Sequence, residues 1–421
     1  MKDVIAVVLA AGKGTRMKSG IPKVLHRILG KSIIVHILDS IKKSGVNKTI
    51  VVTGHGRGLL KEALKKAAVK VVTQKELLGS GHALISAKKA LQGRSNNVLV
   101  VCGDTPLLKS GTLKELIDKH KQSGASATIL AGKLKDPSGY GRIARDGRGR
   151  IIKIVEEENV KFYEGSKNEI NVGTYCFKAL DIFEALGKVK RDNKKKEYYL
   201  TDAIDILNRE GKLIESVEAE DPDEAIGINE RADLAEATQV LKKRILEEVM
   251  AGGVTVEDPQ TTTIYTGVKI GRDTVIHPNT IIESEVEIGE DSSIGPHARL
   301  RPDVRIGNRV VIGDFVELVR TRVGDDSRIK HLTYLGDTTV GRHVNIGAGT
   351  ITANYDGKNK NKTIIEDGAS IGVGAMLIAP VRIGKGAVVG AGCVVPKNHN
   401  VPKGATVAGV PARALKKEGA A

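Results

Sequence analysis

Tryptophan is absent from this chain of 421 residues, and aromatic residues together make up only 3% of it. Proteins that bind single-stranded nucleic acids stack bases on aromatic side chains, and the chain contains none of the common nucleic-acid-binding motifs. The formal net charge of +16 therefore does not indicate a nucleic-acid partner. A positive field also suits an enzyme whose substrates are anionic phosphates, because it raises their concentration near the surface.

Cysteine and long apolar runs are scarce as well. Cys102, Cys176 and Cys393 are odd in number, far apart in the sequence, and without the spacing of metal ligands or redox pairs, so we expect three reduced structural thiols. No apolar run approaches the length of a membrane span, and no cleavage-type motif follows the apolar segment Val4 to Ala11. These absences predict a cytoplasmic protein without a membrane partner.

A glycine loop directly follows the first apolar run. Val4 to Leu9 predicts a buried strand, and Leu9 to Met17, LAAGKGTRM, leaves its carboxyl end. Ligands bind at this edge of parallel sheets. Gly12 and Gly14 allow the backbone to turn successive N–H groups toward one point, which suits a phosphate, and Arg16 adds positive charge. An ordinary strand-to-helix turn is the alternative interpretation.

Apolar runs alternate with helical patterns over the first half of the chain. The expected strands are Val4 to Leu9, Thr49 to Val52, Val69 to Val72 and Val98 to Val101, and the expected helices between them are Ile33 to Lys43 and Leu59 to Ala67. This alternation predicts an α/β Rossmann-like domain with a parallel sheet and helices on both faces. We expect the carboxyl ends of these strands to meet near the glycine loop.

Two of these strands are followed by polar segments. Gln74 opens the segment QKELLGSGHA, where its amide can bond the edge of a planar base while Gly79 and Ser80 approach the base; a plain turn before a helix is the alternative. Asp104 follows the strand Val98 to Val101. A lone carboxylate beside phosphates indicates a metal, and Mg²⁺ prefers one or two protein oxygens together with phosphate oxygens and water.

An aliphatic residue recurs every six positions in the second half of the chain. The members of this series are Ile270, Ile276, Ile282, Ile288, Ile294, Leu300, Ile306, Ile312 and Leu318, and then Ile365, Ile371, Leu377, Ile383, Val389 and Val395. A period of six gives three flat faces per coil, which predicts a left-handed parallel β-helix. The series breaks at Val319 to Thr339 and at Thr352 to Thr363, and we expect loops with functional side chains there.

The length and these two patterns divide the chain. A chain of 421 residues exceeds one typical core, so two domains are expected. Apolar residues from Leu234 to Val249 recur at helical spacing, which predicts one amphipathic helix. We therefore expect a first domain at 1–229, a linker helix at 230–251 and a second domain at 252–421.

The glycine loop and the lysine segment after it carry a family resemblance. LAAGKGTRM, followed by PKVL (Pro22 to Leu25), resembles the opening of the sugar-phosphate nucleotidyltransferases. Over nearly its whole length the chain is similar to the bifunctional N-acetylglucosamine-1-phosphate uridylyltransferases that are also glucosamine-1-phosphate acetyltransferases. The resemblance implies a homotrimer with active sites between subunits, with Mg²⁺ as cofactor.

The implied activity has two steps and yields UDP-N-acetylglucosamine, a precursor for cell-wall biogenesis. The first is acetyl transfer from acetyl-CoA to glucosamine-1-phosphate. The second is uridylyl transfer from UTP to N-acetylglucosamine-1-phosphate, with release of pyrophosphate.

For uridylyl transfer, an in-line substitution, the protein supplies positioning and charge neutralisation. The resemblance assigns Arg16 and Lys23 to the developing phosphate charge, and Asp104 and Asn229 to Mg²⁺. A surface lysine is the alternative for Lys23, and a helix N-cap is a competing role for Asn229. The residues implied to bind the nucleotide are Leu9, Ala10, Ala11, Gly12, Gly14, Gln74, Gly79 and Ser80. Those implied to bind the sugar are Gly141, Glu156 and Asn171.

The breaks in the six-residue series and the coil between them look like the acetyltransferase signature, in KHLTYLGD (Lys330 to Asp337), VNIGAGT (Val344 to Thr350) and NYDG (Asn354 to Gly357). By this resemblance His331 is the general base for the glucosamine amine, and the Ala348 amide donates to the thioester oxyanion. The residues implied to bind the sugar phosphate or acetyl-CoA are Arg301, Tyr334, Asn345, Asn354, Tyr355, Ala391 and Arg413.

Three positions depart from the family's pattern. Val319 stands in place of a phosphate-binding lysine, although Arg320 is adjacent and is a candidate substitute. Val373 replaces a usual serine, and Gly409 replaces a usual arginine. These departures favour an alternative, a single-activity sugar-phosphate nucleotidyltransferase whose β-helix serves only for trimerisation.

Other residues argue for acetyl transfer. His331 and Tyr334 are both present. The ending AGVPAR resembles the coenzyme A-binding ending of simpler hexapeptide acyltransferases. Arg413, Lys416 and Lys417 are available there for the phosphates of coenzyme A.

Overall fold

The computed structural model describes residues 3–54, 56–65, 67–91, 96–162, 168–191, 193 and 195–415. The chain divides into two compact units, unit 1 (Met1–Thr238) and unit 2 (Gln239–Ala421). The division falls within α7 (Arg231–Ala251), in the segment predicted as a linker helix. Within the described ranges, no helix has the length and apolar character needed to cross a membrane.

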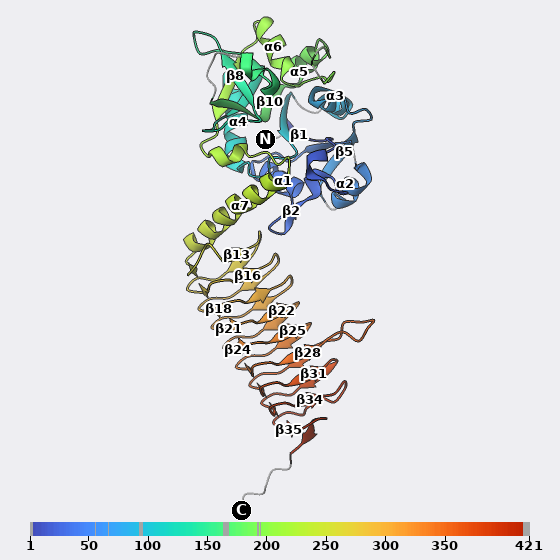
Figure 1. Cartoon of the computed structure of the whole chain (residues 1–421), viewed down its shortest axis with the longest axis vertical. Coiled ribbons are helices and arrows are strands. Elements are labelled where there is room, and N and C mark those ends of the chain that lie inside the picture. Colours follow the sequence, from blue (N-terminus) through green and yellow to red (C-terminus); the bar gives the residue numbers. More distant parts are fainter. Residues whose placement is uncertain are drawn as a thin grey trace, which may run out of the picture. The chain divides into compact units, whose positions relative to one another are not determined.

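Unit 1 is built on a nine-stranded sheet (Figure 1). Its strands are β1 (Val4–Ala10), β4 (Thr49–Thr53), β5 (Val69–Thr73), β6 (Asn97–Cys102), β7 (Ala127–Lys133), β8 (Gly141–Arg145), β9 (Ile151–Val155), β10 (Glu169–Lys178) and β11 (Ile214–Glu218). The order is β11-β7-β10-β6-β1-β4-β5, and β8 pairs with both β10 and β9. A separate hairpin joins β2 (Arg27–Ile28) to β3 (Lys31–Ser32).

Helices cover both faces of this sheet. They are α1 (Ile33–Lys43), α2 (Arg57–Ala63), α3 (Ser80–Leu91), α4 (Ser110–Ser123), α5 (Ala179–Leu186) and α6 (Asp202–Arg209), with 3₁₀ turns η1 (Thr15–Met17), η2 (Lys23–Leu25), η3 (Glu157–Phe162) and η4 (Pro222–Ala225). Apolar side chains of α3, α5 and α6 share one core cluster with β1 and β6. Burying these residues removes apolar area from water, the main stabilising term of such a sheet.

The predicted parallel sheet is confirmed for β1, β4, β5 and β6. The sheet as a whole is mixed, because β10, which was not among the strands expected from the sequence, runs antiparallel to β6, β7 and β8. Between β8 and β10 the structure describes only β9 and the short η3, and antiparallel neighbours need no helical crossover. The helix expected at Leu59 to Ala67 is observed as α2, which begins at Arg57 and ends at Ala63.

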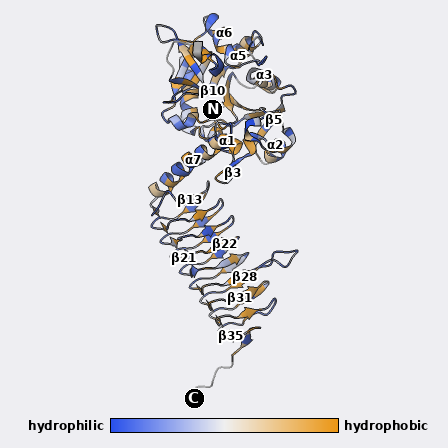
Figure 2. Ribbon diagram, in the orientation of Figure 1, coloured by the Kyte–Doolittle hydropathy of each residue, from blue (hydrophilic) through white to orange (hydrophobic). Residues whose placement is uncertain are grey.

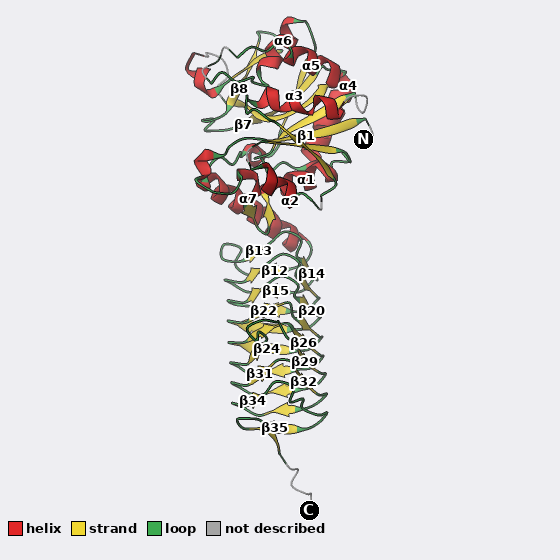
Figure 3. Cartoon of the chain, turned by 90° about the vertical axis from the view of Figure 1, so that its right-hand side faces the viewer, coloured by secondary structure: helices red, strands yellow, loops and turns green. Residues whose placement is uncertain are grey.

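Unit 2 is the predicted left-handed parallel β-helix, with short strands stacked on three faces (Figure 3). The first face consists of β12 (Thr255–Val256), β15 (Val275–Ile276), β18 (Ser293–Ile294), β21 (Val311–Asp314), β24 (Arg328–His331), β27 (Asn345–Ile346), β30 (Ser370–Ile371), β33 (Val388–Val389), β35 (Thr406–Ala408) and β36 (Arg413–Ala414). The second face consists of β13 (Thr263–Ile264), β16 (Ile281–Ile282), β19 (Arg299–Leu300), β22 (Glu317–Val319), β25 (Tyr334–Gly336), β28 (Ile351–Ala353), β31 (Met376–Ile378) and β34 (Val394–Val395). The third face consists of β14 (Lys269–Ile270), β17 (Glu287–Ile288), β20 (Arg305–Ile306), β23 (Arg322–Val323), β26 (Thr338–Val340), β29 (Thr363–Ile365) and β32 (Val381–Ile383).

The six-residue series supplies the interior of the coil. Ile294 and Ile312 are register partners, Ile312 pairs in turn with Ile329, and all three are fully buried. Hydrophobic residues lie along the strands of both units (Figure 2). Because each coil stacks its aliphatic residues on those of the next, the interior is one continuous apolar column.

The two breaks in the series have different causes. Between Thr352 and Thr363 a coil carries an inserted hairpin, closed by a bridge between Tyr355 and Lys360. Between Val319 and Thr339 there is no inserted loop, because β22 to β26 continue the three faces without interruption. The prediction of a loop at this first break is therefore wrong: coil partners such as Val311 and Arg328 are one residue closer in sequence than Ser293 and Val311, which shifts the phase without adding a loop.

Candidate active sites

A cavity of about 520 Å³ opens where the strands of unit 1 end. Its wall comes from the loops after β1, β5 and β6 and from the segment before α7. The residues predicted from sequence that line it are Leu9, Ala10, Ala11, Gly12, Gly14, Arg16, Lys23, Gln74, Gly79, Ser80, Asp104 and Asn229. The expected meeting of strand ends at the glycine loop is thus observed, and it gathers residues from most of unit 1.

Gly14 allows the glycine loop and Lys23 to approach each other. Its φ is +61°, in the left-handed region, and a Cβ built there would lie 2.8 Å from Cβ of Lys23. Any larger residue would be strained and would also push the lysine segment away. The glycine therefore allows Lys23 to lie close to the loop.

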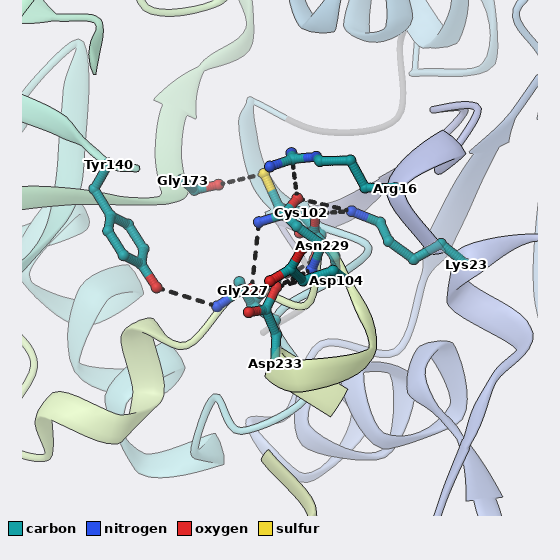
Figure 4. A network of polar contacts seen from close by, with 11 residues as sticks. Arg16, Lys23, Cys102, Asp104, Tyr140, Gly173, Gly227, Asn229 and Asp233 are labelled. Atoms are coloured by element: carbon teal, nitrogen blue, oxygen red, sulfur yellow. Dashed lines mark hydrogen bonds and ion pairs between the residues drawn. The ribbon is translucent and has the colours of Figure 1, made fainter. Parts of the chain in front are cut away.

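Four of the polar side chains that line the cavity meet in one network of contacts (Figure 4). Lys23 Nζ lies 2.6 Å from Asp104 Oδ2 and donates to Asn229 Oδ1 at 3.3 Å. Arg16 Nη2 donates to the same Asn229 oxygen at 2.9 Å. The ammonium of Lys23 is mostly buried, with 14% of its side chain exposed, so its charge acts in a less polar medium than water.

Asn229 does not act as the helix cap that its position suggested. Its side-chain oxygen accepts from the two cations, while the N–H groups of Asn229 and Glu230 donate to Asp233 Oδ2 at 2.6 and 3.0 Å. Asp233 is a site residue that the sequence reasoning missed. An acidic residue at the third position of a helix, as in a capping box, was the available signal.

The donor set fits a divalent cation. Asp104 Oδ2 and Asn229 Oδ1 both lie within hydrogen-bond reach of one positively charged atom, Lys23 Nζ, so the two oxygens converge on a position suited to a cation. One carboxylate and one amide oxygen leave coordination positions for phosphate oxygens and water, as Mg²⁺ prefers. Among the residues with described positions, no group of three or more His, Cys, Asp and Glu side chains forms a metal site.

The base-side residues are held by internal contacts. Gln74 is buried and donates through Nε2 to the Gly79 carbonyl at 3.1 Å. The Ser80 hydroxyl accepts from the N–H of Leu200 at 3.0 Å. These contacts fix one wall of the cavity at the start of α3.

The predicted sugar residues lie next to one another but are not among the cavity-lining residues. Gly141 and Asn171 are register partners on β8 and β10. Asn171 donates to the Tyr175 hydroxyl at 2.7 Å, and Glu156 accepts from Thr201. The side chains of Asn171 and Glu156 are therefore held by neighbouring residues, and Gly141 is placed by the pairing of β8 with β10.

Cys102 links the sugar residues to the cavity. It lines the cavity, and its thiol donates to the Gly173 carbonyl at 3.2 Å. Burial, reinforced by the nearby Asp104, raises the pKa of Cys102 to about 12, so the thiol stays protonated. Its position two residues before Asp104 was the sequence signal that could have placed it in the site.

In unit 2, the predicted acetyltransferase residues fall on two corners of the coil. His331 ends β24 on the first face, and Ala348 follows β27 one coil further along the same face. In the described part of the chain, the His331 imidazole and the Ala348 N–H make no hydrogen bond. Both groups are therefore available at the corner between the first and second faces.

The other corner, between the second and third faces, holds a charged cluster. Arg320 pairs with Asp337 through two hydrogen bonds of 2.6 and 2.8 Å, and Asn354 donates to the same carboxylate. The Arg320 guanidinium holds the pKa of Asp337 below its usual range. Arg301, which follows β19 at this corner, pairs with Glu317 at 3.1 Å. The charge of Arg320, the candidate substitute for a lysine at Val319, is thus already compensated by Asp337.

The remaining predicted residues of unit 2 lie on its surface. Asn345 and Ala391 are exposed, and Tyr334 is half-buried. Tyr355 is 61% exposed, and its hydroxyl donates to the Gly357 carbonyl at 2.7 Å. Arg413 lies on β36 at the end of the first face, whereas Lys416 and Lys417 lie outside the described residues. A single chain therefore presents these groups on separate corners of the coil.

Comparisons with known proteins match both units. The nucleotidyl transferase family matches residues 5–223, and the bacterial transferase hexapeptide family matches residues 267–302, 285–320 and 362–397. Two similar relatives are each described as "Bifunctional protein GlmU". One, from Shouchella clausii, is 43% identical and covers 94% of both chains. The other, from Pelotomaculum thermopropionicum, is 45% identical and covers 90% of both. A solved structure of UDP-glucose pyrophosphorylase with UDP-glucose is 22% identical, with a TM-score of 0.48, and covers 57% of this chain and 98% of that one.

Proposed function

The chain belongs to the family of bifunctional GlmU proteins, and on this premise we propose which of its residues carry each of two reactions. The enzyme transfers an acetyl group from acetyl-CoA to glucosamine-1-phosphate and then a uridylyl group from UTP to the product, which yields UDP-N-acetylglucosamine for cell-wall synthesis. Both units match transferase families, so a β-helix that only trimerises is not retained. For the functional boundaries we propose 1–229, the linker helix 230–251 and 252–421.

Uridylyl transfer is assigned to the cavity of unit 1. The observation that carries it is the meeting of Arg16, Lys23, Asp104 and Asn229 beside the glycine loop. An oxygen of the sugar phosphate attacks the α-phosphorus of UTP, a new P–O bond forms, and the bond to the pyrophosphate leaving group breaks. Arg16 and Lys23 stabilise the negative charge that spreads over the phosphate oxygens in this step.

The glycine loop, Gln74, Gly79 and Ser80 position the nucleotide, and Gly141, Glu156 and Asn171 position the sugar. Positioning matters because the two reacting groups must be held in line. Asp104 and Asn229 would hold the divalent metal of the family, for which we propose Mg²⁺. When bound, this ion neutralises charge on the phosphate oxygens.

Acetyl transfer is assigned to unit 2. The amine nitrogen of glucosamine-1-phosphate attacks the thioester carbonyl, and His331 accepts the proton that the amine loses. The Ala348 N–H donates to the oxyanion, and the C–S bond breaks to release coenzyme A. Arg301, Tyr334, Asn345, Asn354 and Tyr355 bind the sugar phosphate, whereas Ala391 and Arg413 contact acetyl-CoA.

We further propose a homotrimer in the cytoplasm, with each acetyl-transfer site completed by two copies. The separate corners that carry His331 and Arg301 support this, because neighbouring prisms in a symmetric trimer bring different edges together.

Two assays on the full chain test the assignment. Pyrophosphate release is measured with UTP or dTTP and a panel of sugar phosphates, and thiol release is measured with acetyl-CoA and glucosamine-1-phosphate. We expect the fastest pyrophosphate release with UTP and N-acetylglucosamine-1-phosphate. A faster reaction with another pair would contradict the assigned substrate, and the absence of thiol release would contradict the assignment to unit 2.

A further inference from the structure

A cluster of three side chains lies behind the base-binding end of the unit 1 cavity: Gln74, His82 and Tyr198, here called the base cluster. The proposed function uses only Gln74. Gln74 follows β5, His82 is in α3, and Tyr198 lies between α5 and α6. Gln74 lines the cavity although only 3% of the residue is exposed, so its few contacts decide how its amide is presented to a ligand.

The contacts of Gln74 fix the orientation of its amide. Nε2 lies 3.1 Å from the Gly79 carbonyl oxygen and 3.0 Å from His82 Nδ1. A backbone carbonyl can only accept a hydrogen bond, so the amide atom that faces it must be the NH₂ group. The second N–H of that group points at His82 Nδ1, which accepts it when the ring proton is on Nε2.

Both acceptors are themselves held in place. Gly79 has a φ of +98°, and a Cβ there would lie 2.7 Å from the Tyr198 carbonyl oxygen. Tyr198 is hydrogen-bonded on both sides of this loop, to the Leu78 carbonyl and to the N–H of Gly81, each at 2.8 Å. The loop therefore cannot move its carbonyl away from Gln74 without breaking these bonds.

The His82 ring is positioned by stacking. It lies against the Tyr198 ring with centroids 6.2 Å apart and planes at 27°. The Arg191 guanidinium lies over the same Tyr198 ring at 5.4 Å. Stacked rings and cation–π contacts favour one ring orientation, which keeps Nδ1 directed at the amide.

With both N–H groups of Gln74 engaged inside the protein, only Oε1 remains for a ligand. No hydrogen bond to this oxygen exists among the residues that the structure describes. We propose that His82 is a positioning residue that makes Gln74 a pure hydrogen-bond acceptor, so that the cavity selects a base with an N3–H, such as uracil, over cytosine. This inference rests on the proposed function, in which Gln74 faces the base of the nucleotide.

The chemistry of the two bases explains the selection. Uracil presents an N3–H donor, which a fixed acceptor can bond. Cytosine presents an unprotonated N3 at the same place, so two acceptors would face each other. A site built around one hydrogen bond rejects an analogue that cannot make it, because a buried polar group is then left unpaired.

The test compares UTP and CTP as substrates of full-length variants. His82→Phe keeps a ring against Tyr198 but removes the Nδ1 acceptor. We expect kcat/KM for UTP to fall about fivefold, the loss of one ordinary hydrogen bond, with the change in KM rather than kcat and with CTP affected less. His82→Asn, which places an acceptor oxygen near the position of Nδ1, is expected to restore most of the UTP to CTP ratio. Lys89→Ala, an exposed position on the same helix, is the control that leaves the ratio unchanged.

An unchanged UTP to CTP ratio in His82→Phe would overturn the proposal, as would an equal loss in His82→Phe and His82→Asn. Should His82→Phe fail to fold, His82→Ala gives the same comparison against His82→Asn. A wild-type enzyme that releases no pyrophosphate from UTP would instead overturn the proposed function, so the two failures are distinguishable.

Discussion

The two units bring functional side chains together by different rules. In unit 1, parallel strands deliver their loops to one edge, so Arg16 and Asn229, 213 residues apart in sequence, share a hydrogen bond. In unit 2, the coil repeat decides which residues share a corner. His331 and Ala348 lie at the ends of the neighbouring strands β24 and β27, while Arg301 belongs to another corner. A sheet edge can thus complete a site within one chain. A three-sided prism spreads its residues, and its site is expected to need the edges of two copies.

The largest expected effect is the loss of acetyl transfer, without loss of uridylyl transfer, when a residue of unit 2 is changed. His331→Ala removes the proposed general base, so thiol release from acetyl-CoA with glucosamine-1-phosphate should fall about 10²- to 10⁴-fold. Pyrophosphate release from UTP and N-acetylglucosamine-1-phosphate should stay at the wild-type rate. His343→Ala, an exposed histidine of the same unit, serves as the control. Wild-type thiol release in His331→Ala would remove this histidine from the mechanism.

Lys23→Ala tests unit 1, because it should lower uridylyl transfer and leave acetyl transfer unchanged. Loss of one preorganised charge at the transferring phosphate should lower kcat for uridylyl transfer about 10²- to 10³-fold, with a much smaller change in UTP binding. Acetyl transfer should be unaffected. The control is Lys18→Ala, an exposed lysine just after the glycine loop. Equal losses in kcat and in UTP affinity would instead indicate a lysine with a structural role only.

The contrast between the units also explains what the sequence could predict. The strand at Val4 to Leu9 and the six-residue series follow from local periodicity, and both are observed. The antiparallel β10 was not predictable in the same way, because strand direction depends on pairing with β6 and β7, which are distant in sequence.

Side-chain partners were the least predictable feature of the sites. The sequence placed Asn229 near a helix start, but only the fold shows that Asp233 takes over the capping and leaves the Asn229 oxygen to Arg16 and Lys23. Likewise, the break at Val319 to Thr339 was visible as a change of phase. A coil shortened by one residue and an inserted loop disturb a period of six alike, so the pattern alone could not tell them apart.

Truncating a buried side chain of unit 2 should lower the stability of that unit without affecting the nucleotide site of unit 1. Ile312 is fully buried between Ile294 and Ile329 in the coil interior, so Ile312→Ala should destabilise unit 2 by about 2–5 kcal/mol through the cavity it leaves. Urea denaturation followed by circular dichroism measures this, and UTP affinity should stay unchanged. Ile281→Ala, on the outer surface of the same β-helix, should cost less than about 1 kcal/mol. Equal losses in both variants would contradict the described interior.

The smallest effect concerns pH and unit 1. Burial, with the nearby Lys178 and Lys121, lowers the pKa of His120 to about 4, and His120 lies between Thr128 and Asn97. In the unfolded chain the pKa of this histidine is near 6.5. At a pH between these two pKa values the unfolded chain therefore binds more protons than the folded chain. The free energy of unfolding thus falls as the pH falls, by about 2 kcal/mol from pH 6.5 to 5. His120→Gln should show a smaller fall in its urea midpoint over this interval. A fall as large as in wild type would contradict the buried neutral histidine.

Mixed assemblies test the difference between the units most directly. The variants His331→Ala and Arg301→Ala, each expected to be deficient in acetyl transfer, are co-expressed, and thiol release is measured on the purified mixture. If each acetyl-transfer site takes His331 from one copy and Arg301 from its neighbour in a symmetric trimer, about one quarter of the sites regain both residues and activity returns to that extent. The same mixture made from Lys23→Ala and Asp104→Ala should regain no uridylyl transfer, because both residues line one cavity of one chain. No recovery in the first mixture, or recovery in the second, would contradict the account.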